Sequence, residues 1–295
     1  MTNNFNNQTE SLKATPKLTP EEWKQKKKAE RDIVFKMIDD ASKEVATNPE
    51  SLKGYLDTQS QMDRYSATNA LLIYYQFPKA TQIKDFNEWA EKKVSITRGA
   101  KSFSIIEPTE YVKNDGSTGL SYNVKKVFDV SQTNSKANQT QAYNNDPRKV
   151  SAAMIDTSPV NVEMTDEMPY ENMGAFFDSE AETLYIKKDI GDSVALCQCL
   201  AQELAHAQLS IDNEDYSRKK MGFKATCIGY MLCKKNGIDA EIFKIKTIPD
   251  EYRAMNPKEI RKELSSIRNS MSTINSRVSE ELYRRKEQRN KEYER

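Results

Sequence analysis

The chain has 295 residues, of which 30% are charged and 37% hydrophobic, and its formal net charge is +1. This length allows one large or two modest domains, and no segment is basic enough to indicate nucleic-acid binding on charge alone. No apolar run approaches the roughly 18 residues of a membrane span. The first 15 residues lack the apolar stretch of a signal peptide, so we expect a cytoplasmic protein without membrane contact.

Residues 1–18 are polar and are predicted to be disordered. A helix is expected from Pro20 to about Ala46, because Thr19 can cap it and Glu22 completes a capping box. The apolar residues of this helix are predicted to form one stripe: Trp23, Val34, Met37, Ile38, Ala41 and Val45. Cap and stop signals predict three further helices, over residues 49–63, 67–76 and 86–92.

The apolar period then changes from helical spacing to alternation. Residues 102–112 and 120–130 are predicted to form a β-hairpin around the turn signal at Asn114-Asp115-Gly116. Residues 19–130 are therefore expected to form a first domain of helices followed by a hairpin. Residues 131–149 are rich in Ser, Thr, Asn and Gln and are predicted to be a linker.

A second domain is expected over residues 150–248. It begins with short paired strands at 174–178 and 183–186, and helices follow from Ser193 to about Leu209 and from Arg218 to Asn236. Gly237 is a good helix stop. The four cysteines lie inside the helical patterns and are expected to be buried, reduced thiols: Cys197, Cys199, Cys227 and Cys233.

Residues 249–295 are expected to be mainly one long helix that starts at Pro257. Its apolar residues follow heptad spacing: Ile260, Leu264, Ile267, Met271, Ile274 and Val278. Two interpretations remain open. The stripe packs on its own protein, or it supports self-association through residues 257–282. With these elements the predicted fold class is α+β.

The helix beginning at Ser193 contains Gln202-Glu203-Leu204-Ala205-His206. A zinc peptidase helix reads His-Glu-x-x-His, because histidines one turn apart reach one metal ion and the glutamate acts as general base. Here a glutamine occupies the first ligand position, and amide oxygen is a poor zinc ligand. His206 is also the only histidine in the chain. We therefore interpret Glu203 as a vestigial catalytic residue and His206 as a vestigial metal ligand, and we expect no cofactor.

Binding of single-stranded DNA requires cations that follow the phosphates and flat side chains on which bases stack. The first domain offers both kinds of residue: Arg64, Tyr65, Asn69, Tyr74, Trp89, Lys92, Lys93, Arg98, Lys101, Lys125 and Lys126. Each also has a structural alternative. Trp89 fits a core position, Asn69 fits a cap-type contact, and Lys125 with Lys126 fits a solvated strand edge.

Several segments together resemble the ArdC-type antirestriction proteins, in particular the LtrC-like proteins. They are DRYSATNALLI at 63–73, PKAT at 78–81 followed by Phe86 and Trp89, RGAK at 98–101 within 94–106, VFDVSQT at 127–133 and LAHA at 204–207. The resemblance extends from about Thr19 to Asp239. It implies an N-terminal domain that binds single-stranded DNA, a zincin-like (metallopeptidase-fold) second domain, and protection of incoming DNA of a mobile genetic element.

The chain departs from this family at two ligand positions. Gln202 replaces the first histidine, and Thr226 stands where the family's later acidic ligand is expected, in a segment that reads KATCIGY at 224–230. The prediction is a single-stranded-DNA-binding antirestriction protein, not an enzyme, whose partners are single-stranded DNA and a host defence or conjugation protein. Two rivals remain: an active zinc metallopeptidase with an unusual site, and an interaction protein that inhibits a host defence enzyme without binding DNA.

Overall fold

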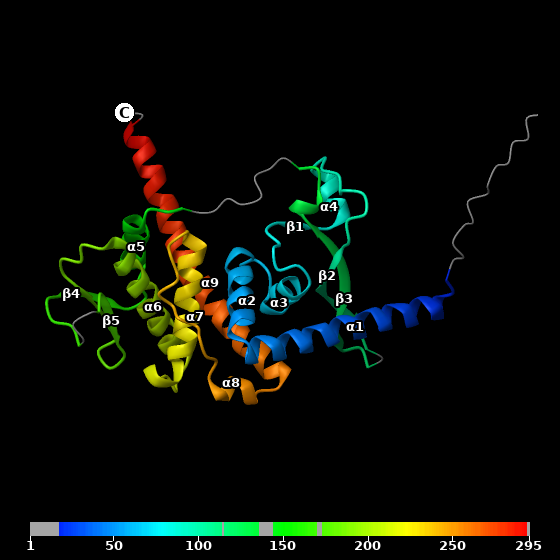
Figure 1. The fold of residues 1–295 in the computed structure, drawn as a ribbon, viewed down its shortest axis with the longest axis horizontal. Coiled ribbons are helices and arrows are strands. Elements are labelled where there is room, and N and C mark those ends of the chain that lie inside the picture. The colour runs from blue at the N-terminus through cyan, green and yellow to red at the C-terminus, as the bar shows by residue number, and fades with distance from the viewer. Residues whose placement is uncertain (1–17, 114, 136–143, 170–172, 294–295) are drawn as a thin grey trace, which may run out of the picture.

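The structure, a computed structural model, describes residues 18–113, 115–135, 144–169 and 173–293. It combines long helices with two small sheets and ends in a long C-terminal helix (Figure 1), so the predicted α+β class is confirmed. Nearly all of the segment predicted to be disordered, residues 1–18, and the middle of the predicted linker lie outside the described residues.

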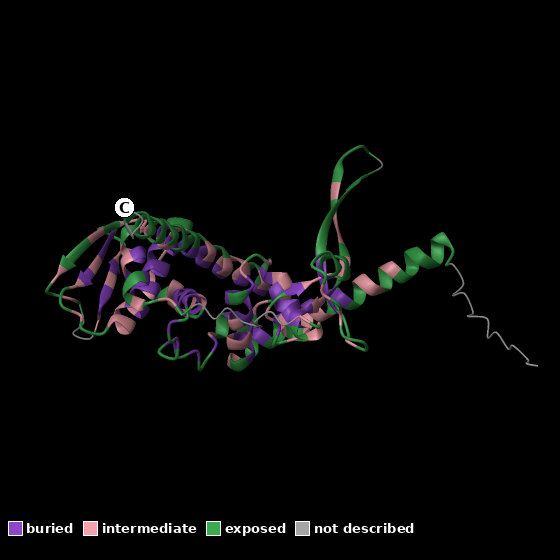
Figure 2. Ribbon diagram, turned by 90° about the horizontal axis from the view of Figure 1, so that it is seen from above, coloured by how far each residue is buried: buried purple, intermediate pink, exposed green. Residues whose placement is uncertain are grey.

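Four helices open the fold: α1 (Pro20–Thr47), α2 (Pro49–Gln61), α3 (Ala67–Gln76) and α4 (Phe86–Glu91). The capping box of α1 is confirmed, since the Thr19 N–H donates to Glu22 Oε2 at 2.8 Å and the Glu22 N–H donates to Thr19 Oγ1 at 3.3 Å. The apolar stripe is buried only from Val34 onward. Trp23 is 57% exposed, contrary to expectation, because the N-terminal half of α1 extends beyond the body (Figure 2).

The first sheet has the strand order β1 (Ile83–Lys84), β3 (Thr118–Asp129), β2 (Phe103–Val112), and all pairs are antiparallel. The predicted hairpin is therefore confirmed. The base of the hairpin lies in the core, whereas its far half projects from the body (Figure 2).

Two amide side chains of α3 bind the free edge of β2. The Asn69 amide donates to the Ile106 carbonyl and accepts from the Ile106 N–H, both at 2.9 Å. The Gln76 amide makes the same pair of bonds with Ser104, at 2.8 and 2.9 Å. An edge strand exposes unpaired backbone groups, and these side chains satisfy those groups as a neighbouring strand would.

The second sheet has the order β4 (Asn161–Thr165), β6 (Thr183–Lys187), β5 (Ala175–Asp178); β4 runs parallel to β6 and β5 antiparallel to it. The predicted strand pair is thus β5 and β6. The sequence reading missed β4 and also α5 (Pro147–Asp156), which begins inside the predicted linker. Helices α6 (Ser193–Asp212) and α7 (Arg218–Asn236) follow, and Gly237 ends α7 with φ 71°.

Two C-terminal helices complete the fold, α8 (Asp250–Ala254) and α9 (Pro257–Tyr293). The heptad residues of α9 are each at most 2% exposed and belong to the largest core cluster. The stripe therefore packs on its own chain, as the first of the two interpretations expected. Self-association through residues 257–282 stays a prediction, and it requires another face of α9.

The largest core cluster crosses the predicted domain boundaries, which stay predictions. It joins the end of α1, α2 and part of α3 to α5, α6, α7 and α9. Helix α3 contacts three clusters with successive residues: Leu71 lies in the largest one, and Leu72 and Ile73 lie in clusters on either side of the first sheet. The two parts of the chain are thus connected through shared core.

All four cysteines are free thiols. Cys197, Cys227 and Cys233 are buried and Cys199 is half-buried, which agrees with the expected role as packed thiols. Among the described residues, no helix is both long and apolar enough to cross a membrane.

Candidate functional site

The motif Gln202–His206 lies in the second half of α6, in the core. Glu203 is 3% exposed and His206 is 1% exposed, so neither faces open solvent. The hydroxyl of Tyr216 lies 3.0 Å from His206 Nδ1. Burial, with a smaller effect of the Arg218 charge, lowers the pKa of His206 to about 3. The imidazole is therefore neutral at pH 7.

The Glu203 carboxylate is fully engaged by protein groups. Its Oε2 accepts the Phe177 N–H of β5 at 2.8 Å, and its Oε1 accepts Arg218 Nη1 at 3.2 Å. Arg218 Nη2 forms an ion pair with Oε2 and also donates to the Phe177 carbonyl at 3.0 Å. Both backbone groups of Phe177 are thereby satisfied, which closes the outer edge of β5.

We tested whether these residues fit a zinc ion. The first ligand position holds Gln202, and the later one holds Thr226, whose hydroxyl donates to the Gly222 carbonyl at 2.9 Å. These two side chains line one small cleft of about 230 Å³, and His206 is not part of that lining. Among the described residues, no group of three or more His, Cys, Asp or Glu is arranged to hold a metal ion. The donor set does not fit zinc.

The second candidate site lies on the connection between α4 and β2, which we call the cationic loop (residues 92–101). Its four predicted DNA-binding cations are exposed: Lys92, Lys93, Arg98 and Lys101. No ion pair to any of the four occurs among the described residues. Gly99 takes a φ of 85°, which favours glycine, and open space surrounds it.

Residues after β3 hold the cationic loop in place. The Thr97 N–H donates to the Gln132 carbonyl at 2.8 Å, and Gln132 Nε2 donates to the Lys101 carbonyl at 2.8 Å. Asp129 is fully buried and accepts the N–H groups of Thr81 and Gln82 at 2.6 and 2.9 Å. The VFDVSQT segment therefore positions the loop.

Several predicted DNA-binding residues make structural contacts, and their role in DNA binding stays a prediction. Trp89 is only 2% exposed and its Nε1 donates to the Phe128 carbonyl at 3.0 Å, whereas Phe86 on the same helix is 64% exposed. Asn69 uses both amide atoms on β2 and has no edge to offer a base. Tyr74 packs against Gly54 of α2, where a Cβ would lie 2.5 Å from the ring.

Of the remaining predicted DNA-binding residues, two lysines form ion pairs with carboxylates. Lys125 forms ion pairs with Asp85 at 2.9 Å and Glu107 at 3.0 Å, and these bonds raise its pKa. Lys126 contacts Glu30 of α1 at 3.4 Å. Arg64 is exposed, and Tyr65 is half-buried against the core of the first sheet. Arg64 and the four cations of the loop are exposed and have no ion pair among the described residues, whereas Lys126 is exposed but paired. Phe86 is an exposed aromatic that the sequence analysis had not selected.

The family model for the N-terminal domain of anti-restriction factor ArdC matches residues 23–154. Over its first half the chain is therefore similar to the ArdC-type proteins. Its fold is similar to the crystal structure of the antirestriction ArdC protein from plasmid R388 in its metal-free form, with a TM-score of 0.51 and 14% identity over 75% of this chain and 86% of that one. The Mn(II)-bound structure of the R388 protein gives 0.50 and 14%, over 74% and 85%. No curated protein sequence matches this chain.

Proposed function

We propose that this chain is an ArdC-type protein, which binds single-stranded DNA without sequence preference and acts in antirestriction for a mobile genetic element. The observation that carries the proposal is the cationic loop, whose four exposed cations have no ion-pair partner among the described residues. By contrast, Lys125 and Lys126 are held by carboxylates. Phosphates are the counter-charge that such a loop can take up.

An exposed aromatic completes the site. Phe86 is 64% exposed, and it begins the short helix that leads into the cationic loop. A base can stack on such a ring while the loop cations bind the neighbouring phosphates. Occupancy of transferred single strands would then protect them from attack, which is a passive mechanism that needs no catalytic step.

The test is a mobility-shift titration with a single-stranded oligonucleotide at several salt concentrations. Arg98→Gln with Lys101→Gln should weaken binding about tenfold and reduce the slope of log K against log[salt] by about 1.4, because each phosphate contact contributes about 0.7 on single strands. Lys219→Gln with Lys220→Gln removes the same charge from exposed positions on α7 and serves as the control.

Equal weakening by the two variants would mean a general charge effect and would contradict the site. Absence of any binding by the unaltered chain would favour the rival in which the protein inhibits a host defence enzyme by direct contact. Such a protein acts on its partner without DNA.

We also propose that the second half of the chain is a zincin-like domain that has lost its metal and its peptidase chemistry. Three observations support this: Gln202 and Thr226 stand at ligand positions, and the Glu203 carboxylate, which should activate water, is bound to Arg218 and Phe177. The R388 protein has an Mn(II)-bound structure; we expect this chain to retain far less than one metal ion per chain.

Metal analysis of protein purified without chelator tests this proposal. Gln202→His together with Thr226→Glu should raise the metal content, because it supplies an imidazole one helical turn from His206 and a carboxylate at the position of the family's acidic ligand. Retention of about one zinc by the unaltered chain, with peptide cleavage that Glu203→Ala abolishes, would establish the metallopeptidase rival instead.

A further inference from the structure

The sheet β4-β6-β5 has two edge strands, β5 and β4. Side chains satisfy outward backbone groups of β5, whereas the outward groups of β4 are open. The Glu203–Arg218 pair satisfies the outward backbone groups of Phe177 on β5. The edge of β2 is likewise closed by the Asn69 and Gln76 amides. No side chain among the described residues makes such bonds to the outer edge of β4, which pairs only with β6.

Strand β4 is accessible to solvent at its outer edge, where a further strand can pair with it. Every residue of Asn161–Thr165 is exposed or half-exposed, and Met164 is 56% exposed. The Thr165 carbonyl accepts the Lys188 N–H at 2.9 Å, on the β6 side. Because the backbone groups of successive strand residues point to opposite sides, those of Val162 and Met164 point to the open edge.

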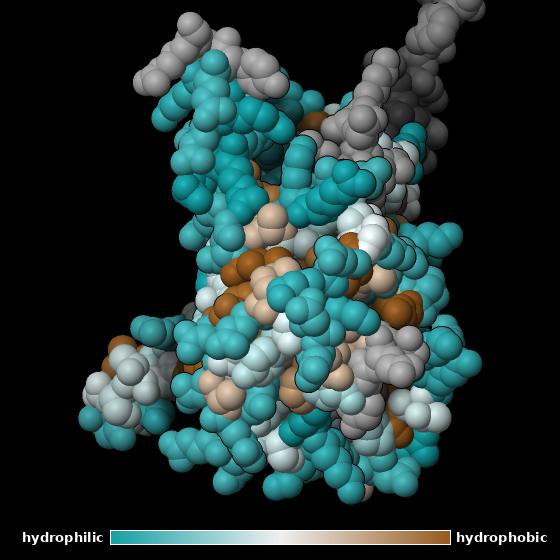
Figure 3. Space-filling model, turned by 90° about the vertical axis from the view of Figure 1, so that its left-hand side faces the viewer, coloured by the Kyte–Doolittle hydropathy of each residue, from teal (hydrophilic) through white to brown (hydrophobic). Residues whose placement is uncertain are grey.

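The side of the molecule that carries β4 and β5 is mainly hydrophilic around a few apolar patches (Figure 3). The strand and the two residues after it, NVEMTDE, contain three carboxylates and no Lys or Arg. One of the three, Asp166, is paired with Lys188 at 2.8 Å, and the others leave the edge acidic. Such an edge repels phosphates and attracts a basic segment.

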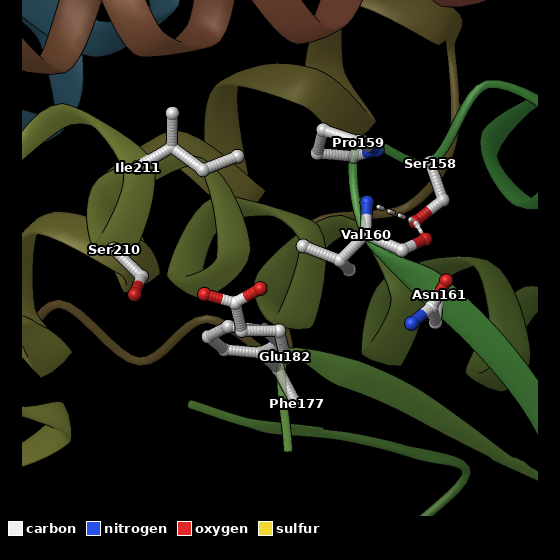
Figure 4. Close-up of a pocket in the computed structure, with 8 residues that line it drawn as sticks. All are labelled: Ser158, Pro159, Val160, Asn161, Phe177, Glu182, Ser210 and Ile211. Carbon is white, nitrogen blue, oxygen red and sulfur yellow. Dashed lines mark hydrogen bonds between the residues drawn. The ribbon is translucent and has the colours of Figure 1, made fainter. Parts of the chain in front are cut away.

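An open cleft of about 450 Å³ lies at the N-terminal end of β4. Its lining comes from the connection between α5 and β4, the first residue of β4, β5, the β5–β6 turn and the end of α6: Ser158, Pro159, Val160, Asn161, Phe177, Glu182, Ser210 and Ile211. Figure 4 shows the Glu182 carboxylate directed into the cleft, across from Val160 and Ile211. No ion pair to Glu182 occurs among the described residues.

We propose that a basic, extended segment of a partner protein adds as a strand to the open edge of β4 and places a Lys or Arg side chain in this cleft. The backbone of the segment pairs with Val162 and Met164. The aliphatic stem of the basic side chain contacts Val160 and Ile211, and its charged head binds Glu182. This surface is separate from the cationic loop and does not depend on DNA binding.

The probe is a random seven-residue peptide library displayed on phage and selected on the full chain. Selected sequences should share one Lys or Arg between β-branched residues. A fluorescent peptide of the selected consensus should bind about tenfold more weakly to Glu182→Gln. Glu180→Gln removes the same charge from the same turn, outside the cleft lining, and should leave binding unchanged.

Hydrogen exchange locates the edge. The peptide should slow exchange of the amides of Val162 and Met164 and leave those of Ser104 and Ile106, which α3 already protects, unchanged. Selection of peptides without a basic residue, or unchanged affinity with Glu182→Gln, would overturn the proposal. Protection of amides only in other strands would also contradict it, as would displacement of the peptide by a single-stranded oligonucleotide. A dimer of this chain in sedimentation that forms through β4 would identify a second copy, rather than a basic partner, as the occupant of the edge.

Discussion

Glu203 lies in a segment that resembles the metallopeptidase motif, and protein groups bind its carboxylate. A general base must reach a water molecule, and this carboxylate instead binds a guanidinium and a backbone N–H. Arg218 supplies the positive charge beside this carboxylate, and it also donates to the Phe177 carbonyl at 3.0 Å. The pair is a structural contact between α6, α7 and β5.

The first prediction concerns this pair. Arg218→Ala leaves the Glu203 carboxylate buried without its counter-charge and should lower the free energy of unfolding by about 2–3 kcal/mol. The low end applies because the Arg218 side chain is 36% exposed. Urea unfolding measures the change. Arg253→Ala, which removes the exposed pair with Asp250, should cost less than about 1 kcal/mol. Equal losses in the two variants would argue against a buried structural pair.

The second prediction follows from the neutral His206. Its pKa is about 3 in the fold, against about 6.5 in the unfolded chain. Below pH 6.5 the unfolded chain therefore binds a proton that the native protein does not. As the pH is lowered below about 6.5, the free energy of unfolding should fall by about 1.4 kcal/mol per pH unit. The total loss from pH 7 to pH 5 is then about 2 kcal/mol.

The chain has no other histidine, so the effect is assignable. His206→Asn should remove this pH dependence, which urea titrations at pH 7 and pH 5 would show. Carboxylates titrate mainly below this window. If the His206→Asn protein loses as much stability as the unaltered chain, the imidazole is not the group responsible.

At the scale of elements, the sequence predicted those helix ends that are determined by residues within one turn of the chain. The ends of α1, α3 and α7 follow from Thr19, Ser66 and Gly237, because caps act within one turn. Strand β4 escaped prediction because it has few apolar residues and its partner, β6, lies more than 15 residues away. Helix α5 escaped because its first residues share the polar composition of the predicted linker.

The contrast between local signals and partners far apart in the sequence also explains which contacts of the candidate site were predicted. Helical spacing alone placed Gln202, Glu203 and His206 near one another, but no local signal identified Arg218, 15 residues beyond Glu203, as its partner. On α4 the sequence analysis selected Trp89, and not Phe86, as the aromatic for base stacking. Only the position of β3, whose Phe128 carbonyl accepts the indole N–H, decides that Trp89 is buried and Phe86 exposed.

At the scale of the whole molecule, the two proposed surfaces have opposite charge. The cationic loop lies on the first part of the chain, and the acidic edge of β4 lies on the second. Between them runs a shared core in which Leu71, Leu72 and Ile73 of α3 each enter a different cluster. Tyr230 of α7 also donates to Asp57 of α2 at 2.7 Å. The two surfaces are therefore carried by one cooperative body.

The last prediction tests that cooperativity. The chain has two tryptophans, of which Trp23 is 57% exposed and Trp89 is 2% exposed, so a change in tryptophan fluorescence on unfolding reports mainly on the first sheet. Leu264 of α9 is 2% exposed in the largest cluster, and Leu264→Ala should cost about 2–5 kcal/mol. Because α3 joins the clusters, this variant should lower the denaturation midpoint seen by fluorescence as much as that seen by circular dichroism. A fluorescence midpoint that stays in place while the dichroism midpoint falls would show that the first sheet unfolds on its own.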